Sequence, residues 1–381
     1  MKTIAILYER ELDYGGVETH LLALLRKLPT DEFSFVIVSP VSRRFREAAQ
    51  SLGARITPFA HWSAFNPFAL FELGRVLKRE AVDLVHAQSP IAAAPGRLVA
   101  RMLGLPAVVT VHLPVTRYHG TRQTLRARSG RWIYVNLDRF LNHAMTDLLV
   151  YVAGRVRDES VASGLAPAER STVIPNGIDL EDFQGSADRD SLRRSFSVPQ
   201  GASVITFIGR LDEQKGLDLL LDAAAHLETG VEGVEVWLIG DGPARTELQR
   251  QATKLGIDDR VKFWGYQAQI ERYLYASDIF ALPSRYEGMP IVLLEALAAG
   301  IPCVVSRVGD NDLVVEDGKQ GLVVPPNDVT ALAKALNLLL LSPEMRRQMS
   351  EAAVRRSGDF SDEHMAQRYA EMYRTLLSKR R

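Results

Sequence analysis

The sequence of 381 residues contains a single cysteine, Cys303. One cysteine excludes an internal disulfide and a zinc site built from several cysteines, and it is typical of a reducing compartment. Because Cys303 follows Pro302 inside an apolar run, we expect a buried core thiol rather than a nucleophile.

Long apolar runs and an excess of charge are also missing. No stretch reaches the roughly 18 apolar residues that cross a bilayer, and the first apolar run is too short for a signal peptide. The 46 basic and 46 acidic residues give a net charge of zero, so nothing global points to nucleic acid. We therefore expect a cytoplasmic protein without a nucleic-acid partner.

Short apolar segments alternate with helical patterns through most of the chain. Continuous apolar segments joined by helices indicate parallel strands covered on both faces, which is the doubly wound α/β arrangement. The first series of expected strands is 3–8, 33–38, 56–59, 82–86, 107–112, 147–152 and 172–174. After a polar segment, a second series follows at 203–208, 235–239, 260–263, 279–282, 303–306 and 321–323.

The two series predict two Rossmann-like domains in tandem, 1–178 and 179–361. A last helix, 362–381, could pack back on the first domain. In such folds ligands bind at the carboxyl ends of the strands, so the cleft between the two sheets is the expected site.

The segment around residues 284–302 carries the most informative pattern. Pro290 suits the first position of a helix and Gly300 the position just past its end, and the body between them is apolar except for Glu295. A carboxylate in a buried helix needs a hydrogen-bonding partner. The sequence leaves open whether Glu295 pairs with a buried arginine or with a ligand.

The start of this helix lacks an ordinary capping residue. Gly288 and Met289 stand where Ser, Thr, Asp or Asn would cap, and Glu287 precedes them. The free N–H groups could therefore face an anion, and together with two glutamates they could recognise a ligand that carries hydroxyls and phosphates. A solvated helix start beside a surface Glu287 is the alternative.

In the first domain, the pair Gly15-Gly16 follows the first strand and leads into a helix. Paired glycines let the backbone approach a ligand closely, although a tight strand-to-helix turn explains them equally well. The G-x-G-x-x-G spacing of a dinucleotide site is absent, which argues against a dehydrogenase.

Two histidines end apolar strands of the first domain. His112, and with less weight His86, are expected at the rim of the cleft, where His112 could hold a sugar hydroxyl or a backbone carbonyl. A hydrogen-bonded turn histidine is the alternative.

Residues 112–137 contain five arginines and no acidic residue. Such a basic stretch with aromatic residues could contact an anionic membrane or a phosphate-bearing acceptor, and a solvated helix face is the alternative. The arginines are Arg117, Arg122, Arg126, Arg128 and Arg131.

In the second domain, the first strand leads into a loop with Arg210 and Lys215. A guanidinium and an ammonium five residues apart suit a diphosphate and would stabilise it as a leaving group. A second glycine-rich loop, 240–243, follows the next strand. Segment 260–266 then offers Phe263 and Trp264, on which a base could stack.

Two acidic triplets imitate a metal-binding D-x-D pattern, at 188–190 and 310–312. We interpret both as surface loops and expect no metal requirement and no cofactor.

Taken together, these motifs resemble a family-4 retaining glycosyltransferase of the GT-B fold. The residues that carry the resemblance are Gly15-Gly16-Val17-Glu18, His112, segment 173–179, Gly209-Arg210, Lys215-Gly216, segment 240–243, and the pair Glu287 and Glu295. The chain departs from many members in reading Gly-Met-Pro rather than Gly-Phe-Gly after Glu287, so the sugar pocket could differ.

The resemblance implies a role for each matching position. Residues 1–178 would bind the acceptor and 179–361 the nucleotide sugar, with Arg210 and Lys215 on the diphosphate and Glu295 on the ribose. The other implied nucleotide-site residues are Gly16, Gly209, Gly240, Phe263, Trp264 and Val292. The implied sugar-site residues are His112, Glu287, Gly288, Met289 and Pro290, of which His112 and Glu287, like Arg210 and Lys215, would also be catalytic. The acceptor or membrane contacts would come from Glu18, His20, Arg117, Arg122 and Arg126.

The implied activity is transfer of a hexose-type sugar from a nucleotide-diphosphate donor, with a UDP-sugar favoured over a GDP-sugar and the anomeric configuration retained. The acceptor would be a glycan, a lipid-linked molecule or a small hydroxyl compound, and the enzyme could bind peripherally to the cytoplasmic membrane. A nucleotide-sugar epimerase and a non-catalytic sugar-nucleotide sensor are the alternatives. The lack of a dedicated acid/base pair argues against the first, and the intact Arg210 and Lys215 against the second.

Overall fold

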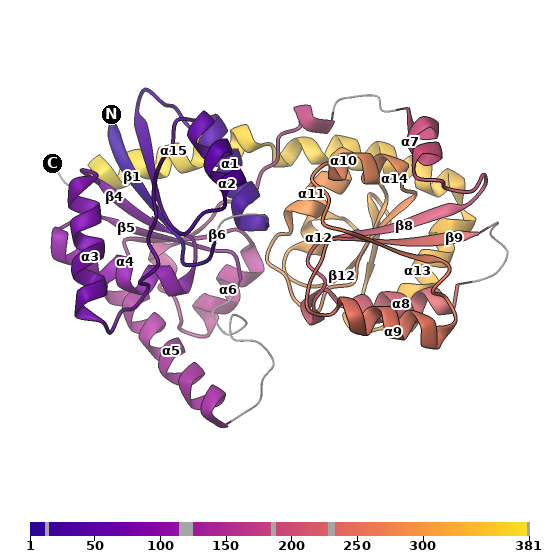
Figure 1. The fold of residues 1–381 in the computed structure, drawn as a ribbon, viewed down its shortest axis with the longest axis horizontal. Helices are drawn as coiled ribbons and strands as arrows, with labels where there is room; N and C mark the ends of the chain where they lie inside the picture. The colour runs from indigo at the N-terminus through magenta and orange to yellow at the C-terminus, as the bar shows by residue number, and fades with distance from the viewer. Residues whose placement is uncertain (12–14, 114–124, 184–187, 228–232, 379–381) are drawn as a thin grey trace. The chain divides into compact units, whose positions relative to one another are not determined.

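The computed structural model describes residues 1–11, 15–113, 125–183, 188–227 and 233–378, and only the backbone of residues 125–131 and 133. The chain forms two compact units (Figure 1). Unit 1 consists of Met1–Gly177 and Asp362–Arg381, and unit 2 of Ile178–Ser361. The sequence placed the first division one residue later, after residue 178, and the second at the same point.

Unit 1 contains a seven-stranded parallel sheet with the order β3-β2-β1-β4-β5-β6-β7. Its strands are β1 (Lys2–Leu7), β2 (Phe33–Val38), β3 (Arg55–Thr57), β4 (Leu84–Ala87), β5 (Ala107–Val111), β6 (Leu148–Tyr151) and β7 (Ser171–Val173). The strand order reverses between β1 and β4, and ligands of α/β sheets bind at the carboxyl ends beside such a reversal.

Helices cover both faces of this sheet, with α1, α2 and α15 on one side and α3, α4 and α5 on the other (Figure 1). The helices of unit 1 are α1 (Gly16–Lys27), α2 (Arg43–Ser51), α3 (Pro67–Arg79), α4 (Pro90–Leu103), α5 (Leu125–Ala144), α6 (Gly154–Ala162) and α15 (Asp362–Ser378), with the 3-10 turn η2 (Ala168–Arg170). The last helix belongs to the core of unit 1, because Tyr369 and Tyr373 are fully buried in one cluster with Ile4 and Leu24.

Unit 2 contains a six-stranded parallel sheet with the order β10-β9-β8-β11-β12-β13. Its strands are β8 (Ser203–Ile208), β9 (Val234–Ile239), β10 (Val261–Gly265), β11 (Ile279–Leu282), β12 (Cys303–Ser306) and β13 (Gly321–Val324). Its helices are α7 (Arg189–Ser195), α8 (Leu217–Ala225), α9 (Arg245–Leu255), α10 (Ile270–Ala276), α11 (Ile291–Ala298), α12 (Asn311–Val314), α13 (Val329–Leu341) and α14 (Pro343–Ser357), with 3-10 turns η3 (Glu181–Phe183), η4 (Glu213–Lys215) and η5 (Gly358–Phe360). The strand order reverses between β8 and β11. The doubly wound α/β fold predicted for both halves of the chain is confirmed.

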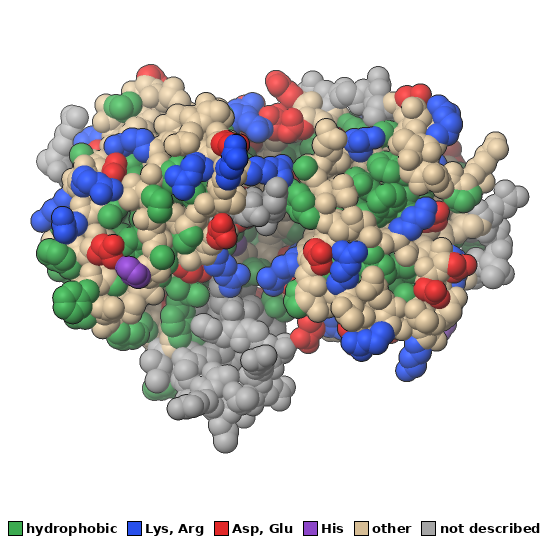
Figure 2. Space-filling view, in the orientation of Figure 1, with side chains coloured by type: hydrophobic (Ala, Val, Ile, Leu, Met, Phe, Trp, Pro, Cys, Tyr) green, Lys and Arg blue, Asp and Glu red, His purple; other side chains and the backbone are tan. Residues whose placement is uncertain are grey.

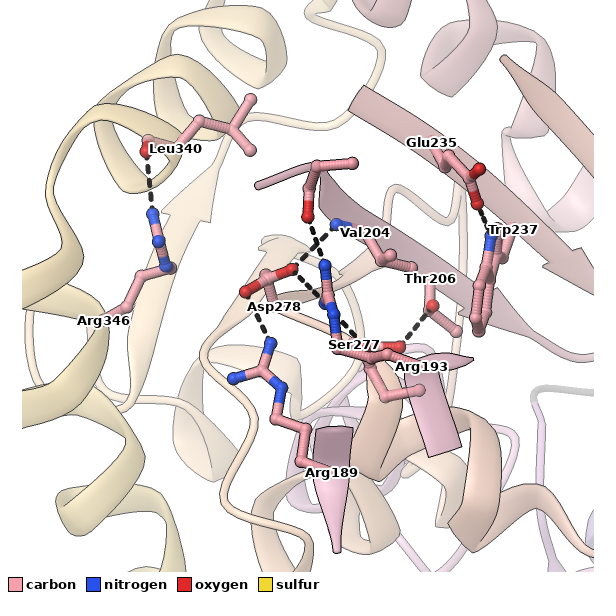
Figure 3. A network of polar contacts seen from close by, with 12 residues as sticks. Arg189, Arg193, Val204, Thr206, Glu235, Trp237, Ser277, Asp278, Leu340 and Arg346 are labelled. Atoms are coloured by element: carbon pink, nitrogen blue, oxygen red, sulfur yellow. Dashed lines mark hydrogen bonds and ion pairs between the residues drawn. The ribbon is translucent and has the colours of Figure 1, made fainter. Parts of the chain in front are cut away.

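Aspartates tie the amino ends of the strands together. Asp83, Asp147 and Asp278 each precede a strand, and each carboxylate accepts a backbone N–H of the neighbouring strand at 2.8 Å. In unit 2, Asp278 also pairs with Arg189 and Arg193 of α7 (Figure 3). These contacts fix the amino edge of the sheet, opposite to the carboxyl edge where ligands of such folds bind.

The interpretation of the two acidic triplets as surface loops holds for the exposure of residues 188–190 but was wrong for 310–312. Asp188 is the N-cap of α7, where its carboxylate accepts the N–H of Asp190 at 3.1 Å. Asp310 and Asn311 are buried at the start of α12. Both triplets therefore lie at helix starts, and only Asp188 caps its helix through the side chain.

Cys303 lies at the start of β12 and is fully buried, as expected of a core thiol, and burial raises its pKa. Across the described ranges, no helix combines the length and the apolar character that a bilayer crossing requires.

Candidate functional site

The carboxyl edge of the unit 2 sheet is built from glycine-containing loops in direct backbone contact. Gly240, after β9, has a φ of +128°, and a Cβ there would lie 2.0 Å from the carbonyl oxygen of Gly209, after β8. Only glycine fits such an approach. Because the N–H of Leu211 also donates to the carbonyl of Asp241 at 2.9 Å, the two loops are locked together on either side of Arg210.

Arg210 projects from this loop with its side chain 63% exposed. Its Nε donates to Asp212 Oδ2 at 2.6 Å, and Nη2 lies 2.5 Å from the same oxygen. The carboxylate of Asp212 is mostly buried and orients the guanidinium, which keeps further N–H groups open to solvent. A planar fork held in this way suits a phosphate oxygen.

Lys215 and Glu287 form a largely buried ion pair. Lys215 Nζ donates to Glu287 Oε1 at 2.6 Å, and the two side chains are only 16% and 6% exposed. The hydroxyl of Ser284 donates to the same oxygen at 2.7 Å, and the amide of Gln214 donates to Oε2 at 3.3 Å. The structure thus joins two residues that the resemblance assigned to different parts of a ligand.

The turn that carries Lys215 is pinned to the segment that carries Glu287. Gly216 has a φ of +63°, and a Cβ there would lie 2.3 Å from the carbonyl oxygen of Pro283. The N–H of Arg285 donates to the carbonyl of Gln214 at 2.7 Å. The ion pair therefore sits on two chain segments whose separation is fixed by backbone contacts.

Helix α11 begins one residue later than predicted, so that Pro290 is its N-cap and makes no side-chain capping bond. The preceding Gly288 is held from the other side, since the N–H of Asp310 donates to its carbonyl at 3.0 Å. Met289 is buried, and Gly300, with a φ of +70°, follows the helix as predicted.

Glu295 lies on α11 and is partly buried. Within the described ranges, no residue donates a hydrogen bond to its carboxylate and no arginine pairs with it, so the structural alternative of a buried arginine partner is not observed. Burial raises the pKa of Glu295 to about 7, and the nearby charges of Asp182 and Glu271 act in the same direction. Val292, one turn earlier, is also partly buried.

Of the two aromatic residues on β10, Trp264 packs inside the unit. Its ring lies 5.3 to 5.4 Å from those of Phe196, Trp237 and Tyr273, measured between centroids. Phe263 precedes a shift in the strand register between Phe263 and Gly265, is partly buried, and makes no ring contact with any described residue. Phe263 is therefore better placed than Trp264 to meet a ligand.

At the carboxyl edge of unit 1, Gly16 opens α1 and is exposed, and no described residue beyond its chain neighbours and its own helix backbone lies within 4 Å of the position a Cβ would occupy. Gly15 is the N-cap and provides no side chain to cap the helix. Glu18 and His20 of the same helix are buried.

His20, His86 and His112 come together beneath this edge. The rings of His20 and His112 meet edge to face at a centroid distance of 5.1 Å. His20 Nδ1 lies 3.0 Å from Asn176 Oδ1, whereas its buried Nε2 has no hydrogen-bond partner in the described part of the chain. Burial lowers the pKa of His20 to about 4 and that of His86 to about 3, and it also lowers the pKa of His112. All three rings are therefore neutral at pH 7.

His86 and His112 are connected through neutral polar side chains. His86 Nδ1 lies 2.7 Å from the hydroxyl of Tyr373, on α15, and Nε2 lies 2.7 Å from that of Thr110. Gln88 bridges the two histidines at 3.3 Å from His86 Nε2 and 3.0 Å from His112 Nε2.

Sequence reasoning missed the residues that hold the charged and imidazole groups. They are Gln88, Thr110, Asn176, Gln214, Ser284, Tyr369 and Tyr373. A signal existed for three of them: Gln88 follows directly after a strand that ends near a histidine, and Asn176 and Ser284 lie in the segments 173–179 and 284–302.

The expected basic contacts fall mostly beyond the described residues. Arg117 and Arg122 lie outside them, and Arg126 lies in α5, where only the backbone is described. The described part of the chain contains no group of three or more His, Cys, Asp or Glu side chains that could hold a metal ion.

Two family patterns match the chain in succession. Residues 14–182 match the family described as Glycosyltransferase Family 4, and residues 188–356 match Glycosyl transferases group 1. The two matches fall on the two halves of the chain.

Curated relatives cover most of the sequence. A UDP-Gal:alpha-D-GlcNAc-diphosphoundecaprenol alpha-1,3-galactosyltransferase of Escherichia coli is 30% identical over 70% of this chain and 69% of its own length. An alpha-D-kanosaminyltransferase of Streptomyces kanamyceticus is 32% identical over 73% of both chains.

Solved structures share the fold. Anabaena Alr3699/HepE in complex with UDP-glucose has a TM-score of 0.84 and 23% identity, covering 98% of this chain and 100% of the other. Sucrose-phosphate synthase of Thermosynechococcus elongatus has a TM-score of 0.82 and 20% identity, with full coverage of both chains.

Proposed function

Because the chain belongs to the GT-B glycosyltransferases of family 4 and group 1, we propose that it transfers a hexose-type sugar from a nucleotide-diphosphate donor with retention of configuration. A UDP-sugar is favoured over a GDP-sugar, since the E. coli relative is named for UDP-Gal and the Anabaena structure holds UDP-glucose. The acceptor is a glycan, a lipid-linked molecule or a small hydroxyl compound.

The observation that carries the proposal is the group of Arg210, Lys215 and Glu287 at the carboxyl edge of unit 2. The exposed guanidinium of Arg210 and the ammonium of Lys215 bind the diphosphate and stabilise the negative charge that develops as it leaves. Glu287 keeps lone pairs for the hydroxyls of the donor sugar, while Lys215, Ser284 and Gln214 hold its carboxylate in place.

In this proposal Glu295 and Phe263 bind the nucleoside part of the donor. The carboxylate of Glu295 accepts the ribose hydroxyls, which would supply the hydrogen bonds that no described residue gives it. Phe263 provides an aromatic surface for the base. Trp264 does not stack on the base, because it packs among three other aromatic rings.

In the reaction, the acceptor hydroxyl oxygen bonds to the anomeric carbon on the face from which the diphosphate departs. The bond between that carbon and the diphosphate oxygen breaks, and a diphosphate oxygen takes the hydroxyl proton. No metal ion is required, because Arg210 and Lys215 supply the positive charge.

The direct test is to incubate the purified protein with UDP-glucose, UDP-galactose and UDP-N-acetylglucosamine and a panel of hydroxyl acceptors, with and without EDTA. Phosphorus and proton NMR then read the released UDP and the anomeric configuration of the product. We expect UDP release that requires an acceptor, survives EDTA and yields the donor's own anomeric configuration. An inverted product, or loss of activity with EDTA, would contradict the mechanism.

Peripheral association with the cytoplasmic membrane, which presents lipid-linked acceptors, is also proposed. Its best support is a face of α3 rather than the arginines of residues 117–126. Phe68 and Phe71 of α3 are 83% and 68% exposed, and Phe65, just before the helix, is 76% exposed. Hydrophobic side chains gather at the edge that α3 occupies in unit 1 (Figure 2). Arg75 and Lys78 continue the same face and have no ion-pair partner among the described residues.

Exposed phenylalanines followed by free cations fit the surface of an anionic bilayer. The rings would enter the headgroup region, and the cations would meet the lipid phosphates.

A further inference from the structure

A chain of buried hydrogen bonds runs from α15 to His112. The members are Tyr369, Thr110, Tyr373, His86 and Gln88, all fully buried and all in unit 1. Their distances, from 2.7 to 3.3 Å, are those of hydrogen bonds. The chain ends at the one histidine of the three that is partly open to solvent.

Gln88 determines the direction of these bonds, because the two ends of an amide are not equivalent. With the Gln88 amide oriented as it is in the structure, its carbonyl oxygen faces His112 Nε2 at 3.0 Å and can only accept, so that nitrogen carries the hydrogen. Its NH2 group can only donate, so His86 Nε2 must be an acceptor.

The other hydrogen bonds of this buried series have the same direction. Since neutral His86 accepts at Nε2, its hydrogen lies on Nδ1 and is donated to the hydroxyl oxygen of Tyr373. Thr110 donates to His86 Nε2 and in turn accepts from the hydroxyl of Tyr369, 3.1 Å away. With this orientation of the Gln88 amide each donor meets an acceptor, and the single lone pair of His86 Nε2 is shared between Thr110 at 2.7 Å and Gln88 at 3.3 Å.

We propose that Gln88, oriented by His86 and Tyr373, is a positioning residue that holds His112 with its hydrogen on Nε2 and an acceptor lone pair on Nδ1. This inference deepens the proposed function and rests on it, together with the sugar contact that the family resemblance implies for His112.

The tautomer decides what His112 can bind. A lone pair on Nδ1 accepts a hydrogen bond from a sugar hydroxyl, whereas it repels a carboxylate or phosphate oxygen. His112 would therefore favour neutral sugars at this position and disfavour donors that place a carboxylate there. The C-terminal helix takes part in this selection through Tyr373, although it lies about 260 residues further along the chain.

The tautomer can be read without any substrate. Long-range proton–nitrogen correlation NMR on the full chain, labelled with nitrogen-15 in histidine, distinguishes the two ring nitrogens, and a His112→Gln variant assigns the signal. We expect the hydrogen of His112 on Nε2 and that of His86 on Nδ1. A hydrogen on Nδ1 of His112 would overturn the proposal.

Two near-isosteric variants test the connection. Tyr373→Phe removes the acceptor of the His86 hydrogen, and Gln88→Glu replaces the donating amide by an acceptor, so both should change the His86 and His112 signals. Tyr275→Phe in unit 2 is the matched control, since its hydroxyl also makes one hydrogen bond, 2.8 Å to the carbonyl of Phe183. Unchanged histidine signals in both test variants would contradict the proposal. If the Gln88→Glu variant does not fold, the histidine signals of the Tyr373→Phe variant alone test the connection.

Binding measurements separate this inference from the proposed function. Measured by calorimetry, the Gln88→Glu variant should bind a nucleotide sugar about tenfold more weakly than the wild type does. Its affinity for the free nucleotide should be unchanged. Equal affinities for wild type and variant would show that Gln88 does not position a sugar contact. If the wild-type protein bound no nucleotide sugar at all, the proposed function would fail, and the NMR result would still report the tautomer.

Discussion

At the scale of single residues, the central feature is the ion pair of Lys215 and Glu287. A buried ion pair contributes little net stability, because the cost of removing two charges from water offsets their attraction. The ion pair of Lys215 and Glu287 instead serves to position the two charged groups. An ammonium and a carboxylate that are already desolvated and fixed by Ser284 and Gln214 can meet a phosphate and a hydroxyl with little rearrangement.

Lys215→Ala tests this role of the ammonium. If Lys215 stabilises the departing diphosphate, the substitution should lower kcat by about 10² to 10³ and change donor affinity much less. The matched control is Lys262→Ala, which removes another partly buried ion pair of unit 2, Lys262 with Glu235 at 2.7 Å. Steady-state kinetics and donor titrations on both variants make the comparison. A loss of affinity with normal kcat would argue against the leaving-group role.

Glu295 gives a prediction about pH. Its pKa is raised from 4.5 to about 7 in the folded protein, so the folded state binds a proton more tightly than the unfolded state does. The wild type should therefore lose stability relative to Glu295→Gln as the pH rises through the interval from about 4.5 to 7. Thermal melts of both proteins at pH 5 and pH 8 measure this difference. A difference that stays constant, or grows in the opposite direction, would contradict the raised pKa.

The sequence could identify charged residues but not their neutral partners. Arg210, Lys215, Glu287 and Glu295 stood out because ionised groups in glycine-rich loops or apolar helices are unusual. Gln214 and similar residues carry no such signal, since a neutral polar side chain is ordinary in any loop. Their roles arise only when segments about 70 residues apart meet in the folded chain.

At the scale of elements, strand and loop geometry decides which residues can reach a ligand. The sequence indicated two aromatic residues on β10, but the register of this strand shifts between Phe263 and Gly265. At this irregularity Trp264 joins an aromatic cluster of unit 2. Helix α7 was missed because all but one of its seven residues are polar or charged, which leaves no apolar periodicity to detect.

The exposed face of α3 carries the prediction about membranes. Changing both Phe68 and Phe71 to Ser should reduce binding to phosphatidylglycerol vesicles at least about tenfold, since each ring contributes on the order of 1.5 to 3 kcal/mol when buried. The substitutions should not unfold the protein, because both side chains are exposed.

Leu338→Ser combined with Leu341→Ser is the matched control, as these exposed side chains lie on α13 of unit 2. Co-sedimentation with phosphatidylglycerol and with phosphatidylcholine vesicles gives the readout. If the α3 variant and the wild type bound the vesicles equally well, α3 would not be the membrane contact. Self-association that disappears in the same variant would point instead to a second copy of the chain.

At the scale of the whole molecule, the chain builds one architecture twice. The alternation of apolar strands and helices is strong enough in the sequence to predict both units. The sequence could suggest the return of α15 to unit 1 but could not establish it, because the contacts of Tyr369 and Tyr373 depend on tertiary packing. Neither the sequence pattern nor the fold identifies the donor, the acceptor or the linkage, since many activities share this architecture.

The measurement that tests the account most directly is the thermal stability of the purified protein against UDP-, GDP- and ADP-sugars and the free nucleotides. Ligand at 100 times its Kd adds about 2.7 kcal/mol to the free energy of unfolding, on the order of 5 to 10 °C for a unit of this size. We expect such a shift with UDP-sugars, and a smaller one in Glu295→Gln. No shift with any nucleotide sugar, under conditions where the protein is folded, would contradict a nucleotide-sugar site on unit 2.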